Sequence, residues 1–253
     1  MCLIVCAWRV HPDFPLILAA NRDEFYARPA EPMATWQDRP ELLAGRDVQA
    51  GGSWLGITRA GRLAAVTNYR ERPAAPAARS RGSIVTDFAD SDRGPLEFAA
   101  ELATEQYAGY SLLACDADSL VYASNRGDAP QSLSPGLYGL SNAALDTPWN
   151  KLTRSRERLG DLLNGEPALD PLLDLMLDKE PAADDDPALP FARPIELTAP
   201  FVITPDYGTR CTTAIIGRAD GHLEVAERRF EPGGEWSGES RFAFVANAWQ
   251  QQT

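Results

Sequence analysis

The chain begins with Met1 and Cys2, and the position of this cysteine allows one specific kind of chemistry. An N-terminal Cys, Ser or Thr can act as a nucleophile because its own α-amine serves as the general base. That amine has a pKa of about 7.7–8.0, so much of it is neutral near physiological pH. Removal of Met1 would put Cys2 in this position. Free cysteines are also often buried and inert, so the sequence leaves two readings of Cys2, nucleophile or strand residue.

The sequence lacks the residues that other common catalytic and nucleotide-binding sites require. The two histidines, His11 and His222, are far apart and lie in predicted turns, which argues against a His-based zinc site or a Ser-His-Asp triad. Neither a G-x-G-x-x-G fingerprint nor a P-loop is present. The run Asp184, Asp185 and Asp186 lies in an acidic, Ala/Pro-rich stretch near 180–190 that is typical of a solvated loop. We therefore predict no metal site and no required cofactor.

The elements that must position Cys2 are mainly predicted hairpins. Apolar and alternating stretches flank short turns such as HPDF, AG, DADS and RADGH. These patterns predict hairpins over 1–22, 53–69, 111–125 and 210–230, with a last strand over 241–249. Helices are predicted over 81–91, 94–107, 146–165 and 171–179. The third is the clearest, because Trp149, Leu152, Leu159 and Leu163 fall on one stripe between Pro148 and Gly165.

This order of elements indicates an α+β fold. Many antiparallel hairpins with helices between them favour two stacked sheets whose outer faces are covered by helices. No repeat of solenoid period and no linker divides the sequence, so we predict one domain over 1–253.

Composition narrows the class of partner. The 253 residues carry a formal net charge of -12, which disfavours nucleic acid and anionic membrane surfaces. No segment reaches the roughly 18 apolar residues of a membrane span. The four cysteines (Cys2, Cys6, Cys115 and Cys211) show no disulfide-framework spacing, and the N-terminus does not resemble a signal peptide. We predict a reducing, cytoplasmic setting, with an organelle interior as the alternative. The oligomeric state is left open.

Several blocks of the sequence resemble one family. The stretch AANRDEFYARP, which follows MCLIV, is similar to the signature of the NRDE family, named from the run Asn21, Arg22, Asp23 and Glu24. Its eukaryotic members are the transport-and-Golgi-organisation proteins. GGSWLGI, VTNYR, YGLSNA and GTRCTT resemble further blocks of that family, so the resemblance runs from residue 1 to about 217. The family in turn resembles the N-terminal-nucleophile (Ntn) hydrolases of the choloylglycine and penicillin V acylase branch, which implies a four-layer αββα sandwich.

The resemblance also implies a catalytic set. Cys2 matches the nucleophile, and Asn68, Asn142 and Arg210 match two asparagines and a late arginine. Arg22 and Asp23 match an Arg and an Asp of the second strand, although the family pattern separates them further. Adjacent strand residues point to opposite faces, and we expect Asp23 to be the one facing Cys2. Asn21, Trp54, Tyr69 and Trp149 are predicted to contact the ligand.

The resemblance assigns each member of this set a task. Arg210, and Arg22 if it points inward, would favour the thiolate. Asp23 would hold the α-amine near the sulfur. Asn68 or Asn142 would donate a hydrogen bond to the oxyanion. Each residue also has a structural alternative: an ion pair for Arg22 and Asp23, turn contacts for the asparagines, and a surface charge for Arg210.

Two functions follow as hypotheses. The first is a cysteine amidohydrolase or acyltransferase that acts on a small acylated molecule. The second is a binding or carrier protein for an apolar ligand such as haem or acyl-CoA, which keeps the fold and pocket without the reaction. Fold resemblance alone does not decide between them.

Overall fold

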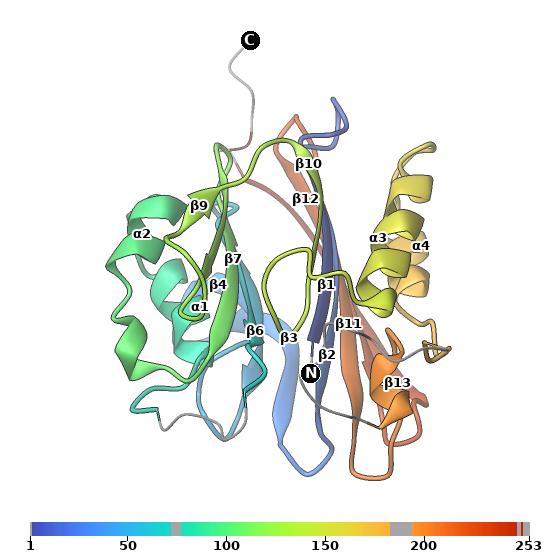
Figure 1. Cartoon of the computed structure of the whole chain (residues 1–253). Coiled ribbons are helices and arrows are strands. Elements are labelled where there is room, and N and C mark those ends of the chain that lie inside the picture. Colours follow the sequence, from blue (N-terminus) through green and yellow to red (C-terminus); the bar gives the residue numbers. More distant parts are fainter. Residues whose placement is uncertain (1, 72–76, 183–193, 247–248, 250–253) are drawn as a thin grey trace.

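Two antiparallel sheets form the centre of the molecule in the computed structural model (Figure 1). The model describes residues 2–71, 77–182, 194–246 and 249. The six strands of the first sheet are, in spatial order, β10 (Gly136–Leu140), β1 (Cys2–Trp8), β2 (Leu16–Phe25), β11 (Tyr207–Gly217), β12 (His222–Phe230) and β13 (Trp236–Val245). The seven strands of the second sheet are β3 (Ala30–Trp36), β4 (Arg39–Asp47), β5 (Leu55–Thr58), β6 (Leu63–Asn68), β7 (Tyr110–Cys115), β8 (Leu120–Ser124) and β9 (Gln131–Ser132).

Helices cover the outer face of each sheet. α3 (Asn150–Leu162) packs on β1 and β10, and α4 (Leu169–Leu175) packs on β11 and β12. α1 (Gly82–Ala89) lies on β5 and β6, and α2 (Pro95–Glu101) lies on β8. Two 3-10 turns complete the described elements, η1 (Thr104–Gln106) and η2 (Ile195–Thr198). The order from side to side in Figure 1 is helices, sheet, sheet, helices, which confirms the predicted four layers.

Strand alternation divides the core into three layers. In β1, Ile4, Cys6 and Trp8 belong to the cluster between the sheets. Leu3 and Val5 point the other way and pack against the α3–α4 layer. A third cluster joins β6, β7 and β8 to α1 and α2. This period of two is the expected behaviour of strands that are buried on both faces.

All four predicted hairpins form, but some elements differ from the prediction. β3, β4, β9 and β10 were not predicted. The sequence does not predict β3 because its buried residues do not alternate and it contains Pro32. Its pairing with β4 also shifts register twice. The last strand ends at Val245, short of the predicted 249. The acidic run Asp184–Asp186 lies outside the described residues.

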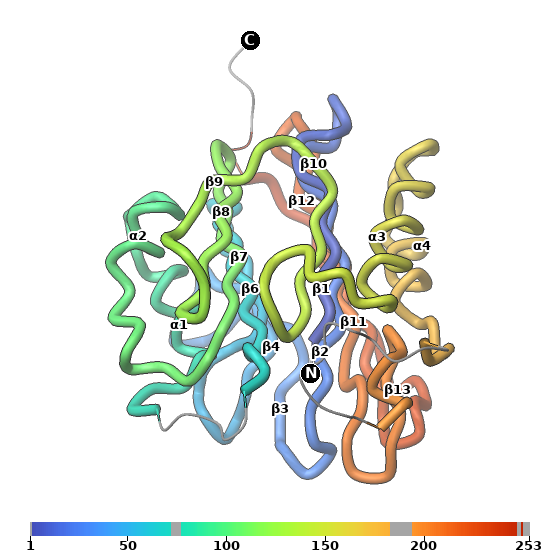
Figure 2. Tube along the Cα trace, viewed as in Figure 1, coloured from blue at the N-terminus to red at the C-terminus, as the bar shows by residue number. Residues whose placement is uncertain are grey.

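The start of β1 lies at the end of the sandwich that carries the β2–β3 turn (Figure 2). The start of β1 lies near the ends of β6 and β10 and the start of β11. β1 pairs with β10 and β2, β2 pairs with β11, and β1 contacts β6. Within the described ranges, no helix is both long and apolar enough to cross a membrane.

Candidate active site

Cys2 begins β1 beside polar groups from three other elements. It is half-buried and lies opposite Arg22 in the β1–β2 register. The hydroxyl of Ser141 donates a hydrogen bond of 2.7 Å to the Cys2 carbonyl oxygen. Continuing the β1–β10 register beyond Ile4 and Leu140 brings Asn142 opposite Cys2. Cys2 is therefore the end of a strand at the rim of the core and not a residue enclosed by aliphatic side chains.

Arg22 shares the strand face of Cys2, between the two sheets. Its side chain is only 5% exposed. The guanidinium stacks on the Trp54 ring at 4.2 Å, and its Nη2 lies 3.7 Å from Asp47 Oδ2. These two contacts hold the positive charge of Arg22 inside the sandwich, on the side where the Cys2 thiol lies.

Asp23 occupies the opposite face of β2, next to α3. We expected Asp23 to face the thiol, but strand alternation gives that side to Arg22. The carboxylate accepts a 2.7 Å hydrogen bond from Thr209 Oγ1. Burial raises the pKa of Asp23, while the charge of Lys151, the Thr209 hydrogen bond and the charge of Arg22 act in the opposite direction. Its backbone N–H lies toward the sulfur of Cys2 and favours the thiolate.

A polar cavity of about 240 Å³ lies at the same end of the molecule, and we call it the asparagine pocket. Asn142 is buried, and its amide Nδ2 donates to the backbone oxygen of Asn68 at 2.9 Å. Asn68 is the last residue of β6, and its side chain is exposed. The pocket is lined by Asn68, Tyr69, Arg70, Glu71, Arg81, Asn142 and Tyr207. Three predicted residues, Asn68, Tyr69 and Asn142, thus meet in one place.

Arg81 is a residue of this site that sequence reasoning missed. It caps the start of α1 and donates to the Gly109 carbonyl at 3.0 Å. Burial lowers the pKa of Arg81, and the negative charges of Cys2, Glu24 and Glu71 partly offset that effect. The charges of Arg81 and Cys2 are therefore close enough to interact.

A close backbone approach brings Arg81 into this position. The Ser53 N–H donates to the Gly82 carbonyl at 3.1 Å. A Cβ on Gly52 would lie 2.4 Å from the Gly82 backbone, so only glycine allows this approach. The GGS segment of GGSWLGI thus fixes the start of α1 against the second sheet.

An apolar groove of about 680 Å³ adjoins the asparagine pocket. The two cavities share Arg70 and Tyr207. Phe25, Leu197 and Ile203 supply most of the apolar surface of the groove, which we call the apolar groove throughout. The Tyr207 hydroxyl donates to the Asp23 carbonyl at 2.8 Å, which ties the wall between the cavities to β2.

Arg210, Asn21 and Trp149 lie outside the asparagine pocket. Arg210 Nη1 donates to three carbonyl oxygens of the β2–β3 turn, those of Phe25, Tyr26 and Arg28. The amide of Asn21 is buried against backbone carbonyls next to α4 and a threonine of β11. Trp149 packs in the core between the first sheet and its helices. These contacts give the three residues structural tasks.

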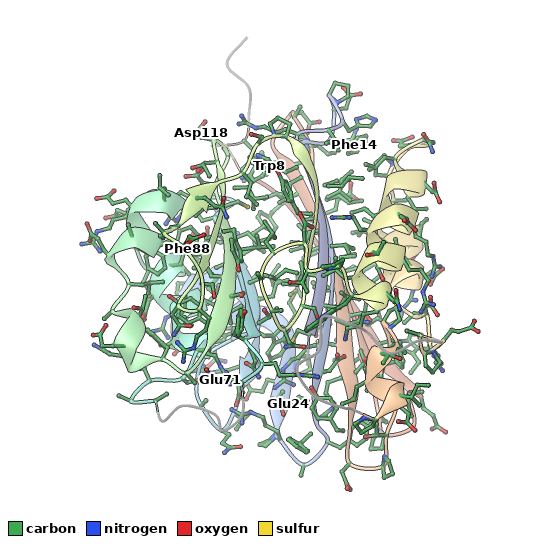
Figure 3. All side chains as sticks on the ribbon, in the orientation of Figure 1. Trp8, Phe14, Glu24, Glu71, Phe88 and Asp118 are labelled. Atoms are coloured by element: carbon green, nitrogen blue, oxygen red, sulfur yellow. The ribbon has the colours of Figure 1, made fainter. Side chains whose placement is uncertain are left out.

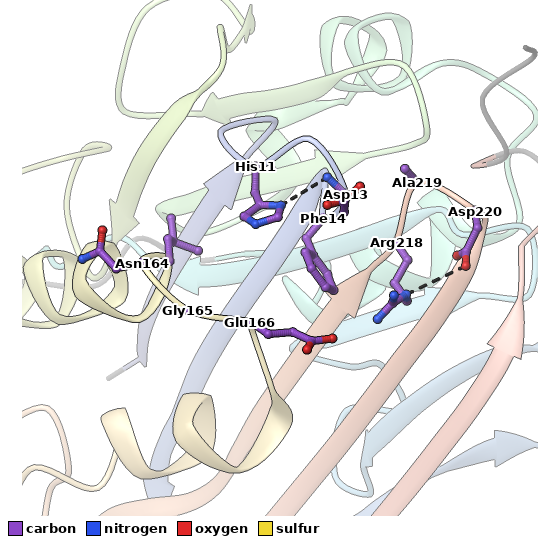
Figure 4. A pocket seen from close by; sticks show the side chains of 10 residues that line it. His11, Asp13, Phe14, Asn164, Gly165, Glu166, Arg218, Ala219 and Asp220 are labelled. Carbon is purple, nitrogen blue, oxygen red and sulfur yellow. Dashed lines mark hydrogen bonds and ion pairs between the residues drawn. The ribbon is translucent and has the colours of Figure 1, made fainter.

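A larger cavity, of about 960 Å³, lies at the opposite end of the sandwich. Its residue Phe14 is at the upper end in Figure 3, whereas Glu24 and Glu71 mark the lower end. Figure 4 shows His11, Asp13 and Arg218 around this cavity. The Asp13 N–H donates to His11 Nδ1, and the Arg218 guanidinium stacks on Phe14. The cavity is too distant from Cys2 to serve the same chemistry.

Burial dominates the titration of Cys2 and raises the pKa of its thiol above the ordinary 9.0. The Asp23 N–H and the Arg22 charge act in the opposite direction without overcoming burial. We therefore expect the rate of Cys2 alkylation by iodoacetamide to keep rising with pH beyond pH 9, because only the thiolate reacts. Arg22→Gln should raise the thiol pKa further and slow alkylation at pH 8. Arg93→Gln, which removes an exposed arginine, is the control; a rate that levels off by pH 7 would contradict this assignment.

The comparisons with known proteins agree with this geometry. The family model for transport and Golgi organisation 2 matches residues 1–232. The chain belongs to the transport and Golgi organisation 2 family. The homolog of this family's protein from Bos taurus is 39% identical over 261 residues, covering 90% of this chain and 92% of the relative. The homolog from Homo sapiens is 38% identical with the same coverage, and the Drosophila melanogaster protein is 23% identical over 94% of this chain and 96% of its own length.

Two solved structures share the fold of this transport and Golgi organisation 2 family member. The first is the Caenorhabditis elegans ortholog of N-acylethanolamine-hydrolyzing acid amidase, with a TM-score of 0.54 and 9% identity over 85% of this chain and 92% of that one. The second is the C2A mutant of the conjugated bile acid hydrolase from Clostridium perfringens, with a TM-score of 0.51 and 8% identity over 98% and 93%. The likeness to these two structures confirms the predicted fold, and the family model and the homologs confirm the predicted family.

Proposed function

We propose that the protein is an Ntn-type cysteine amidohydrolase that acts on a small amide with an apolar acyl group. The observation that supports this most is the position of Cys2. The thiol lies at a strand end beside Arg22, at the end of the sandwich that carries Arg81 and the asparagine pocket, and an apolar groove adjoins that pocket. A carbonyl between the two cavities would have polar groups at its reacting atoms and an apolar surface for its acyl chain.

The proposed reaction begins after Met1 is removed. The free α-amine of Cys2 takes the thiol proton while the sulfur attacks the amide carbonyl carbon. The oxyanion accepts hydrogen bonds from the side-chain amide of Asn68 and from the second N–H of Asn142, whose first N–H is used by Asn68. The ammonium then returns the proton to the leaving amine as the C–N bond breaks. Water hydrolyses the thioester and releases the acid.

The raised thiol pKa supports an amine-assisted attack over a preformed thiolate. Burial keeps Cys2 mostly protonated at neutral pH, so a base must remove the proton during attack. Asp23 is placed to hold that base, because its backbone N–H lies toward the sulfur and its carboxylate is buried on the adjoining face. Arg22 and Arg81 would then stabilise the sulfur as negative charge develops.

The test uses N-acyl p-nitroanilides with acetyl, hexanoyl and palmitoyl groups. We expect release of p-nitroaniline from the protein whose intact mass shows loss of Met1. A matched form with one extra residue before Cys2 keeps the thiol but displaces the amine. That form should be inactive. Equal activity of the two forms would rule out the α-amine as the base, and no release from any substrate by the processed form would refute the proposal.

The apolar groove makes a prediction about chain length. Ile203 is half-buried and lines this groove, so Ile203→Asp should place a charge against a long acyl chain. We expect kcat/KM for the palmitoyl substrate to fall about 10–100-fold, since burying one apolar side chain is worth about 1.5–3 kcal/mol, while the acetyl substrate is affected little. Val10→Asp at an exposed site far from the groove is the control. Equal losses for both substrates would mean that the acyl chain lies elsewhere.

The carrier hypothesis uses the same groove without the reaction. Its volume and apolar lining favour an acyl chain, and among the described residues no histidine or cysteine lines it as an axial ligand for haem. Titration with palmitoyl-CoA separates the two functions. Saturable binding by Cys2→Ala together with absent turnover by the native protein would favour a carrier, whereas turnover that depends on Cys2 favours the hydrolase.

A further inference from the structure

A second polar pocket of about 240 Å³ lies on the other side of Arg22. In the sheet register, Arg22 is opposite Cys2 on β1 and opposite Cys211 on β11, so it separates the two sites. β3 packs against β12 at this point, and the Met33 N–H donates to Glu227 Oε1 at 2.8 Å. We call this cavity the arginine–glutamate pocket. Its charged lining residues are Arg22, Arg210, Arg229, Glu31, Glu227 and Glu231.

The inner wall of this pocket holds buried polar atoms that lack a partner among the described residues. They are Nη1 of Arg22, Nε of Arg210 and Oε2 of Glu227. Arg22 is 5% exposed and Glu227 only 1%. Buried polar groups are nearly always hydrogen-bonded, so three orphans around one cavity indicate a missing polar occupant.

The remaining atoms of the same side chains hold these groups in place. Arg22 is fixed by Trp54 and Asp47, and Arg210 by the carbonyls of the β2–β3 turn. Glu227 Oε1 accepts from the Met33 N–H and lies 3.7 Å from Arg229 Nη1, and the Glu227 carboxyl also has a hydrogen bond with the Cys211 side chain. These contacts hold each side chain in place and leave one of its nitrogen or oxygen atoms without a hydrogen bond. Such an arrangement is typical of a preorganised binding site.

The charges define the occupant. Two guanidinium groups offer unused N–H donors, which suit a carboxylate, and one buried carboxyl offers an unused oxygen, which suits an ammonium. Three arginines and three glutamates balance in formal charge, so neither a polyanion nor a polycation matches the lining. Burial raises the pKa of Glu227, and a cationic group beside it would favour its ionised form.

We propose that the arginine–glutamate pocket binds a small zwitterion of the amino-acid type, with the carboxylate on Arg22 and Arg210 and the ammonium on Glu227. The cavity, of about 240 Å³, is large enough for a small molecule of this type. The exposed residues Glu31 and Glu231 form its rim. This binding requires neither the thiol of Cys2 nor a free α-amine, so it does not rest on the proposed hydrolase reaction, although the two sites share Arg22.

The test is a screen of the twenty L-amino acids against the native protein by saturation-transfer NMR, followed by calorimetry. The best binder is then compared with its analogue lacking the amine and its analogue lacking the carboxylate. We expect saturable binding of at least one amino acid and about tenfold or greater weakening for each analogue, the loss typical of one charged hydrogen bond. Binding of none, or equal binding of the analogue without the amine, would show that the pocket holds water only.

Two matched variants locate the binding. Glu227→Gln keeps an acceptor for the Met33 N–H but removes the charge, and it should weaken the amino acid about tenfold or more. Glu231→Gln removes an exposed rim carboxylate and should change binding less than twofold. Unchanged binding in Glu227→Gln would overturn the assignment. The ligand-analogue comparison on the native protein decides the matter even if Glu227→Gln does not fold.

Discussion

Cys2→Ala is expected to reduce amide hydrolysis by at least about 10³-fold while leaving the fold intact. Loss of a nucleophile removes the covalent route altogether, and comparable knockouts in hydrolases cost about this much or more. Cys2 is half-buried at the end of β1, and its carbonyl, not its thiol, carries the hydrogen bond from Ser141. The thermal midpoint of unfolding should therefore change little.

The matched control for Cys2→Ala is Cys6→Ala. Cys6 lies on the same face of β1, fully buried in the core between the sheets, and burial raises its thiol pKa to about 12. This variant should lower stability by the cost of a small core cavity and keep its turnover per folded molecule. Activity retained in Cys2→Ala, measured as p-nitroaniline release by purified protein, would exclude Cys2 as the nucleophile.

Asp23→Asn is expected to lower kcat by about 10²-fold, because the α-amine that transfers the proton loses the carboxylate that positions it, and a misplacement of about 1 Å can cost that much. The substitution keeps the Oδ1 acceptor for Thr209 and removes the charge that would hold the α-ammonium. Glu227→Gln is the control, because it neutralises another deeply buried carboxyl that does not line the asparagine pocket. A similar loss of kcat in both variants would point to a general structural effect.

The α-amine sets the first acid limb of the pH–rate profile, because only its neutral form can accept the thiol proton. The Asp23 carboxyl adds a second limb at lower pH. Burial raises the pKa of Asp23 above its ordinary 3.8, so the active, ionised form is lost at a higher pH than for an exposed aspartate. Activity should fall as pH drops through that raised pKa. The charge of Lys151 lowers the Asp23 pKa, so Lys151→Met should move this second, more acidic limb to higher pH and Lys151→Arg should restore it. An unmoved limb in Lys151→Met would exclude Asp23 as the group that titrates there.

The local patterns of the sequence predicted the sheets and part of the site. Alternating strands place Cys2 and Arg22 on one face, and the turns after β6 and β10 bring Asn68 and Asn142 to the same end. Alternation also determines which of Arg22 and Asp23 shares the face of Cys2, once the residue paired with Cys2 is known. That pairing is the strand register, which cannot be read from the sequence.

Contacts between distant segments decided what the sequence could not predict. Arg81 reaches the site because Gly52 allows the backbone of α1 to approach, and a single Arg before a helix carries no such signal. Arg210 follows a bulge in β11 and is engaged by the carbonyls of the β2–β3 turn. The apolar groove is built from η2 and residues 203–207, which have no regular apolar period. Sequence motifs identify candidate residues by type. The role of each candidate depends on its hydrogen-bond partners, which only the structure shows.

The central claim is that Cys2 forms a covalent acyl intermediate through its own α-amine. The most direct measurement is peptide mass spectrometry after an acid quench of the processed protein with hexanoyl p-nitroanilide. Our account predicts a hexanoyl thioester on Cys2 that is absent from the form with an extra N-terminal residue and absent from Cys6, Cys115 and Cys211. Substrate turnover without any adduct on Cys2, or an adduct that forms equally well when the amine is displaced, would contradict it.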